Sequence, residues 1–169
     1  MKTKPILPLA CAALLAACGA TPPSTGDEVA AMAASAAGDT LTDPASGARC
    51  DGKDLRLTRD NMQWVIDGSC RDITITASHG SLNVDDARSI TVEGSDFTVL
   101  NAQVGEVRVG GSRNTLNLTR SGRIQLDGDA NMVLGTDIPE VGFGGSDNTV
   151  NASGKPKIHA DAGTGNRVM

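Results

Sequence analysis

The feature that most constrains this chain is a repeat with a step of 17 residues. A short Gly-Ser-x-Asn-Thr-Val/Leu motif recurs along the second half of the sequence. Its leading residues Gly94, Gly111, Gly128 and Gly145 follow one another at steps of 17, and Gly163 follows after 18. Five consecutive units with this spacing indicate that the chain repeats one structural unit.

Apolar residues keep the same spacing in three columns. The first column contains Val65, Leu82, Val99, Leu116, Val133 and Val150. The second contains Ile73, Ile90, Val107, Ile124, Val141 and Ile158, and the third contains Ile75, Val92, Val109, Leu126, Phe143 and Ala160. The second and third columns are separated by one residue, which is the alternation of a half-buried strand. Each unit is therefore expected to hold two short strands.

A unit of this length predicts a coil of a parallel β-solenoid. Helical repeats need about 33 residues or more, whereas a β-solenoid coil can be this short. About seven coils, stacked about 4.8 Å apart, are expected in an all-β domain over residues 48–169. The aromatic residues are Trp64, Phe97 and Phe143, with no tyrosine. So few large side chains suit a core made of thin, repeated layers.

The turn motif suggests two structural devices. The repeated glycines are expected to turn the backbone with positive φ. The asparagine column, made of Asn114, Asn131, Asn148 and Asn166, is expected to stack its amides and to bond the backbone of the turns.

Residues 1–18 have the pattern of an export signal. Lys2 and Lys4 precede an almost wholly apolar run that is too short to span a bilayer as a helix. The run ends at Leu15-Ala16-Ala17-Cys18, which resembles the lipobox of bacterial lipoproteins. The resemblance implies lipid attachment at Cys18 and contact with a membrane. Gly19 resembles the residue that follows the anchor in lipoproteins sorted to the outer membrane, facing the periplasm. The alternative is a plain secretory peptide cleaved nearby.

Residues 19–47 are predicted to be a flexible tether. They hold most of the prolines and are rich in Ala, Ser, Thr and Gly, a composition that buries little surface. Within them, residues 27–37 are Ala-rich and stop at Gly38, so a short helix is possible. It would either cover the open end of the solenoid or remain part of the linker.

Several motifs together resemble the domain of unknown function 3060 family. They are Cys50-Asp51-Gly52, Gly68-Ser69-Cys70, the recurrent turn motif, and Gly154-Lys155-Pro156-Lys157-Ile158 before Gly165-Asn166. The resemblance covers about residues 48–169, and it implies a small parallel β-helix in an exported protein and no established activity. Gly80 and Phe97 depart from it by replacing the turn asparagine, and Met132 by replacing threonine.

The cysteines divide into two groups. Cys18 would carry lipid, and Cys11 lies in the segment that would be removed. Cys50 and Cys70 then remain as an even pair in an oxidising compartment. Twenty residues apart, they lie about one coil apart, and a structural disulfide is expected. Redox catalysis would favour a Cys-x-x-Cys pair instead.

Composition and spacing argue against several functions. A net charge of -5 without a basic cluster disfavours nucleic acid. His79 and His159 fall in different columns, so no metal site and no cofactor is predicted. The carboxylates Glu93, Asp127 and Asp161 share a column. The distance between two members that are two rungs apart is close to the carboxylate separation of an inverting glycosidase, but no aromatic platform accompanies them. No enzymatic activity is predicted.

The remaining hypothesis is an interaction or structural module of the cell envelope. One outer face, composed of Trp64, Ile66, Leu100, Met132 and Leu134, is more apolar than a free surface requires. It could contact an envelope protein or a second copy of the chain, although scattered apolar surface residues are also common. The alternative function is a carbohydrate-binding or carbohydrate-processing module.

Overall fold

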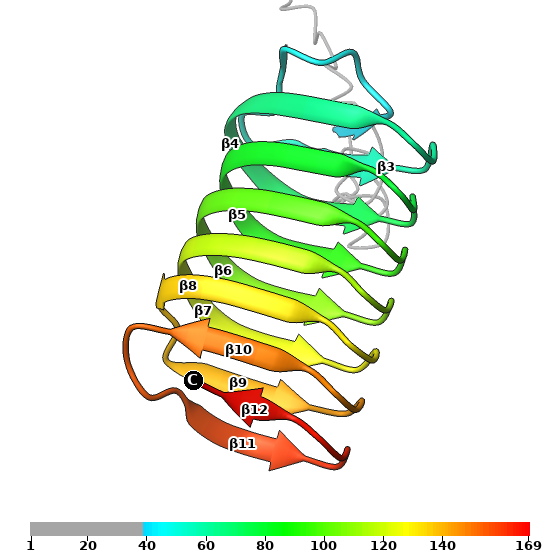
Figure 1. Ribbon diagram of the computed structural model, residues 1–169. Coiled ribbons are helices and arrows are strands. Elements are labelled where there is room, and N and C mark those ends of the chain that lie inside the picture. Colours follow the sequence, from blue (N-terminus) through cyan, green and yellow to red (C-terminus); the bar gives the residue numbers. More distant parts are fainter. Residues whose placement is uncertain (1–38) are drawn as a thin grey trace, which may run out of the picture.

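The computed structural model describes residues 39–169, and these form a parallel β-solenoid of about eight turns (Figure 1). Twelve strands belong to one sheet, and each pairs in parallel with a strand of an adjacent coil. The strands are β1 (Thr40–Thr42), β2 (Ala48–Arg49), β3 (Asp54–Leu57), β4 (Gln63–Ile75), β5 (Ser81–Val92), β6 (Thr98–Val109), β7 (Thr115–Leu126), β8 (Met132–Asp137), β9 (Glu140–Phe143), β10 (Thr149–Ala152), β11 (Lys157–Asp161) and β12 (Arg167–Val168). The predicted fold class and repeat length are confirmed.

Each coil has two walls. In β4 to β7 the two predicted stretches join in one bent strand, whereas later coils separate them into β8 and β9, then β10 and β11. The first stretches, together with β8, β10 and β12, form what we call the front wall, which faces the viewer in Figure 1. The second stretches, with β9 and β11, form the rear wall. Turns carrying the glycine motif connect the rear wall of one coil to the front wall of the next.

The core consists of ladders of inward-pointing side chains. The rear wall supplies the two predicted columns, in register from coil to coil. Their members from Ile73 to Phe143 are at most 1 % exposed. Ile158 and Ala160 were also expected in these columns, but both are exposed. Ile158 pairs with Val141 as expected, but it lies in the last described coil, so no further described coil packs over it. Ala160 is shifted out of its predicted column, because the register of β11 slips and pairs it with Gly142 instead of Phe143.

The first predicted column is wrong at its N-terminal end. Val65 is 48 % exposed, whereas Trp64 and Ile66 are each 1 % exposed. The pairing of β4 with β5 shifts by one residue between Ile66 and Ser69, where Gly68 has a φ of 85°. This is a β-bulge that adds one residue to β4. A slip of one residue exchanges the two faces of a strand, so counting steps of 17 misplaced this stretch.

The asparagine ladder is confirmed. The Oδ1 atoms of Asn131, Asn148 and Asn166 each accept a hydrogen bond at 2.9 Å from the backbone N–H of the preceding asparagine in the column. Their Nδ2 atoms donate to glycine carbonyls at 2.9–3.0 Å. Because these groups are largely buried, the ladder pairs backbone atoms that would otherwise lack partners.

The predicted role of the repeated glycines is wrong. Positive φ occurs at the x position of the motif, as at Arg113 (58°) and Ala130 (55°), and not at the leading glycine. A Cβ atom at Gly111 would overlap the carbonyl oxygen of Gly94 in the preceding coil. The leading glycine is therefore needed because two turns stack closely at this position. The left-handed conformation is adopted instead by the residue at the x position, which is not glycine and belongs to residue types that usually avoid this conformation.

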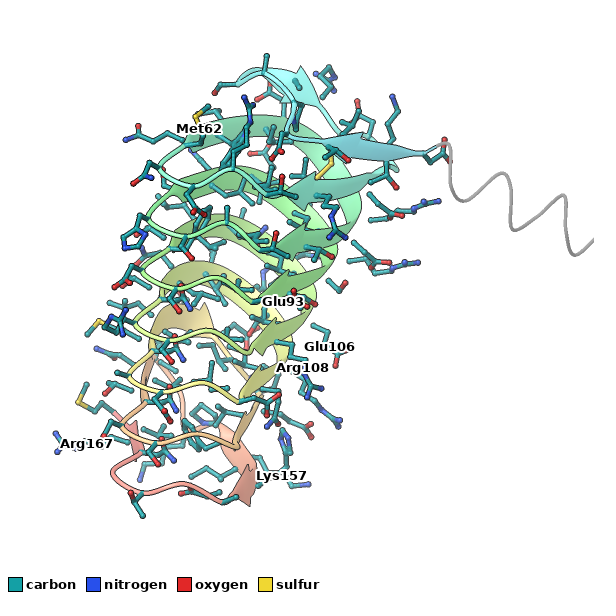
Figure 2. All side chains as sticks on the ribbon, turned by 90° about the vertical axis from the view of Figure 1, so that its right-hand side faces the viewer. Met62, Glu93, Glu106, Arg108, Lys157 and Arg167 are labelled. Carbon is teal, nitrogen blue, oxygen red and sulfur yellow. A yellow bond between two sulfur atoms is a disulfide. The ribbon has the colours of Figure 1, made fainter. Side chains whose placement is uncertain are left out.

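The solenoid begins earlier than predicted. The predicted signal segment 1–18, Cys18, and the possible helix 27–37 lie outside the described residues. The tether was predicted to extend to residue 47, but Thr40–Thr42 already pairs with β3. Next to this end, Cys50 and Cys70 form the predicted disulfide, with their Cα atoms 5.1 Å apart; Figure 2 shows it as a yellow bond.

Candidate functional site

One strip of the front wall is almost without charge. It consists of residues 81–85, 98–102, 115–119, 132–136 and 149–153, and we call it the neutral strip. Asp85 is its single charged residue. Outward positions carry threonine, asparagine and leucine, and Met132 and Leu100 are 47 % and 41 % exposed. A surface this neutral is unusual because free surfaces are normally rich in charge.

A shallow groove runs along the neutral strip across successive coils. Its volume is about 550 Å³, and it is open to solvent along its length. It is lined by residues 83–85, 100–102, 117–119 and 134–136, together with Asn151. The groove lies beside the bend between the front and rear walls, so its axis follows the solenoid and crosses the strands.

The most regular part of the groove is a column in which asparagine and leucine alternate. Strand register places Asn83, Leu100, Asn117, Leu134 and Asn151 in successive coils. The three asparagines are exposed. Among residues 39–169, no hydrogen bond involves the side-chain amides of these three asparagines, so each amide can donate to and accept from a ligand.

Asn101 interrupts the apolar side of the same wall. It is 5 % exposed and stands in the inward column between Val84 and Leu118. Its Nδ2 donates to the carbonyl of Asp85 at 3.1 Å, while its Oδ1 has no partner among the described residues. The donated bond holds the backbone of the preceding coil where the chain bends next to the groove.

The rear wall and the turns have the opposite character. Glu106 and Arg108 project from the rear wall in Figure 2, and ion pairs join neighbouring coils. One of these pairs is Arg71 with Asp54, which makes two hydrogen bonds of 3.0 Å. The Arg71 guanidinium lowers the pKa of the Asp54 carboxyl, and the backbone N–H of Asp72 lowers it further. These charges serve cohesion between coils.

The carboxylate column does not form an acid pair open for catalysis. Asp127 lies 2.6 Å from the guanidinium of Arg108 and accepts a hydrogen bond from Gln125 at 2.7 Å. Asp161 is displaced from the column because the pairing of β11 with β9 shifts. It accepts a bond from Asn166 instead. Glu93 remains exposed on its own rung.

The structure divides the predicted interaction face. Leu100, Met132 and Leu134 lie on the front wall as expected, but Trp64 and Ile66 belong to the core. The Trp64 ring stacks on Phe97 with centroids 6.4 Å apart, and its Nε1 donates to the Pro44 carbonyl at 3.1 Å.

The asparagines of this face were not among the predicted site residues. The sequence does carry a signal for them: charged residues are almost absent from the first stretch of each repeat, and this absence recurs at the same spacing of 17 residues as the core columns.

The two histidines lie far from each other in the sequence and in separate coils. His79 lies in a turn, with a φ of 57°, and His159 lies 3.1 Å from Gln125. Within residues 39–169, no group of three or more His, Cys, Asp or Glu side chains is arranged to hold a metal ion. The same described part of the chain contains no helix long and apolar enough to cross a membrane.

Fold and surface together define a small parallel β-solenoid protein with a neutral strip on its front wall and a charged rear wall. Residues 109–165 match the model of a family described as "Protein of unknown function (DUF3060)". The match supports the resemblance seen in the turn motifs and brings no activity with it. No curated protein and no solved structure matches the chain.

Proposed function

We propose that this chain is a lipid-anchored, non-enzymatic module of the cell envelope that binds a partner through the neutral strip. The observation that carries the proposal is the contrast between the two walls. Several rear-wall charges form ion pairs between coils, such as Arg71 with Asp54 and Arg123 with Glu140. The strip instead presents leucine side chains, and asparagine amides that have no hydrogen-bond partner among residues 39–169. Side chains that contribute nothing to cohesion and face solvent in register are available for binding.

Binding is favoured over catalysis by the surroundings of the carboxylates. Asp127 is held by Arg108 and Gln125, an arrangement typical of a structural ladder. A general acid or base works best when its pKa is tuned near the working pH and it faces a substrate cleft. The groove lies on the front wall, and Asp85 is the single carboxylate in its lining.

The anchor is supported by the lipobox-like sequence that ends at Cys18. Its test is detergent phase partition of the full chain produced in a bacterium. Cys18→Ala is expected to move the protein from the detergent phase to the aqueous phase, while the matched control Cys11→Ala leaves it in the detergent phase. Equal partition of the wild type and Cys18→Ala would contradict the anchor.

The binding strip is tested by capture of envelope components on the immobilised full chain. Leu100→Asp is expected to abolish specific capture and still to fold, because its neighbours in the column, Asn83 and Asn117, are polar and exposed. Glu106→Gln, a change on the rear wall, is the control and should retain capture. If Leu100→Asp captures the same components as the wild type, the neutral strip is not the binding surface.

A second candidate function is carbohydrate binding, and the alternation of amides with leucines favours it. Trp64, the single tryptophan of the chain, cannot report such binding directly because it is buried in the core. It reports folding instead.

A further inference from the structure

The groove repeats its chemistry every second coil. Asn83, Asn117 and Asn151 are separated by Leu100 and Leu134. Two rungs of a β-sheet span about 9.6 Å, and the column from Asn83 to Asn151 spans about 19 Å. A ligand that uses all three amides must therefore be linear, lie along the solenoid axis, and repeat at nearly this distance.

The ligand must also be uncharged. Asp85 is the single charged residue of the neutral strip, and the strip has no lysine or arginine. Phosphate groups and nucleic acids are bound mainly through such cations, so the groove is not suited to them. Amide side chains, which both donate and accept, suit neutral groups that do the same.

An extended peptide does not fit the spacing. Side chains on one face of a β-strand recur about every 6.6–6.8 Å, well short of two solenoid rungs. Peptides that add a strand also need a free sheet edge, whereas the front-wall strands β5 to β7 are paired on both sides.

We propose that the groove binds a single β-1,4-linked chain of N-acetylated sugars. In an extended chain of this linkage each sugar is turned over relative to the last, so acetamido groups on one side recur every second sugar. The length of that disaccharide is close to two solenoid rungs. Each asparagine amide would pair with the N–H and C=O of one acetamido group, and the leucines would pack against acetyl methyl groups and sugar C–H faces.

This inference rests on the proposed function, since it names the ligand of the same neutral strip. An open groove without an aromatic platform predicts modest affinity per site. Binding then depends on contacts spread over several rungs, and short oligosaccharides should bind far more weakly than a hexamer.

The test is a titration of the full ¹⁵N-labelled chain, in detergent micelles, with the N-acetylglucosamine hexamer. The side-chain amide signals of Asn83, Asn117 and Asn151 are expected to shift together and to saturate. Cellohexaose, which has the same linkage and no acetamido groups, should bind at least several-fold more weakly. Maltohexaose, which is α-linked, should cause no shift. No shift with the hexamer, or equal shifts with maltohexaose, would overturn the proposal.

Matched variants locate the site. Asn117→Ala is expected to raise the Kd about thirtyfold, the effect of two net hydrogen bonds, and Leu100→Asp more than tenfold. Gln103→Ala removes an exposed amide just beyond the bend and should leave the Kd unchanged. If Asn117→Ala and Gln103→Ala weaken binding equally, the asparagine column is not the site.

The outcomes separate this inference from the function it rests on. If no hexamer binds but Leu100→Asp still abolishes capture of envelope components, the glycan is wrong and the binding strip stands. If light scattering shows a dimer that Leu100→Asp dissociates, the occupant is a second copy of the chain. If neither capture nor hexamer binding depends on Leu100, both proposals are wrong.

Discussion

Removing one rung of the asparagine ladder should destabilise the solenoid far more than removing an exposed asparagine nearby. Asn114 is 1 % exposed; its Oδ1 accepts from the Phe97 N–H at 2.9 Å, and its Nδ2 donates to the Gly94 carbonyl at 3.0 Å. Asn114→Ala deprives both buried backbone groups of a partner. Each unpaired group costs about 1–3 kcal/mol, so the free energy of unfolding should fall by about 2–6 kcal/mol.

The matched control is Asn117→Ala. Asn117 lies three residues further along the same coil, but it is exposed. A surface substitution of this kind usually changes stability by no more than about 0.5 kcal/mol. The pair compares the same chemical change at a buried and an exposed position within one coil.

The assay is urea unfolding followed by Trp64 fluorescence and far-UV circular dichroism. Trp64 is buried against Phe97, so its emission changes when the coils separate. With a slope of about 2 kcal/mol per molar urea, the midpoint of Asn114→Ala should fall by about 1–3 M. The two signals must coincide, because coils of a solenoid can unfold separately. A midpoint equal to that of Asn117→Ala would refute the role of the ladder.

Three further predictions concern the turns, the disulfide and the ion pairs. Gly111→Ala should prevent the close stacking of turns and cause loss of soluble folded protein. Ala130→Gly should instead stabilise the protein by about 0.5–1 kcal/mol, because glycine adopts the left-handed backbone of this position without strain. Thermal unfolding of both variants checks this, and a Gly111→Ala variant more stable than Ala130→Gly would contradict it. Replacing both disulfide cysteines with alanine should cost about 3 kcal/mol by loop entropy, measured by urea unfolding, and an unchanged midpoint would exclude a stabilising role. Arg71 lowers the pKa of the Asp54 carboxyl below its ordinary value of 3.8. The ion pair therefore contributes its full stability at a pH above 3.8, and this contribution is lost as the pH falls through the folded-state pKa of Asp54. Asp54→Asn should reduce the loss of stability on acidification, and a pH profile identical to that of the wild type would exclude a stabilising role for this ion pair.

Much of the fold could be predicted because equivalent positions of a solenoid recur in the sequence at one fixed spacing. Each coil contacts mainly its neighbours, so an apolar column in the sequence becomes an apolar ladder in space. For this reason the rear-wall columns as far as Phe143 and the asparagine ladder were placed correctly, down to individual residues such as Val107 and Asn131.

Errors arose where the spatial register departs from the fixed step. The bulge at Gly68 adds one residue to β4, which moved Trp64 from the predicted surface into the core. Nothing in the spacing marks a bulge, because an extra residue is absorbed wherever the backbone can bend. The same limit affected the start of the solenoid, where Thr40–Thr42 lacks the repeat motif yet pairs with β3.

The sequence by itself determined the repeat length, the β-solenoid class, the disulfide pair and the chemistry of each column, since these follow from residue type and step. Only the tertiary structure decided which stretches are shifted by a bulge, that the glycines permit close approach of turns, and that the neutral strip forms one continuous groove. The physical reason is that sequence spacing records contacts between equivalent positions of adjacent coils. The shape of a wall depends instead on where each coil bends, and only the packed chain fixes that.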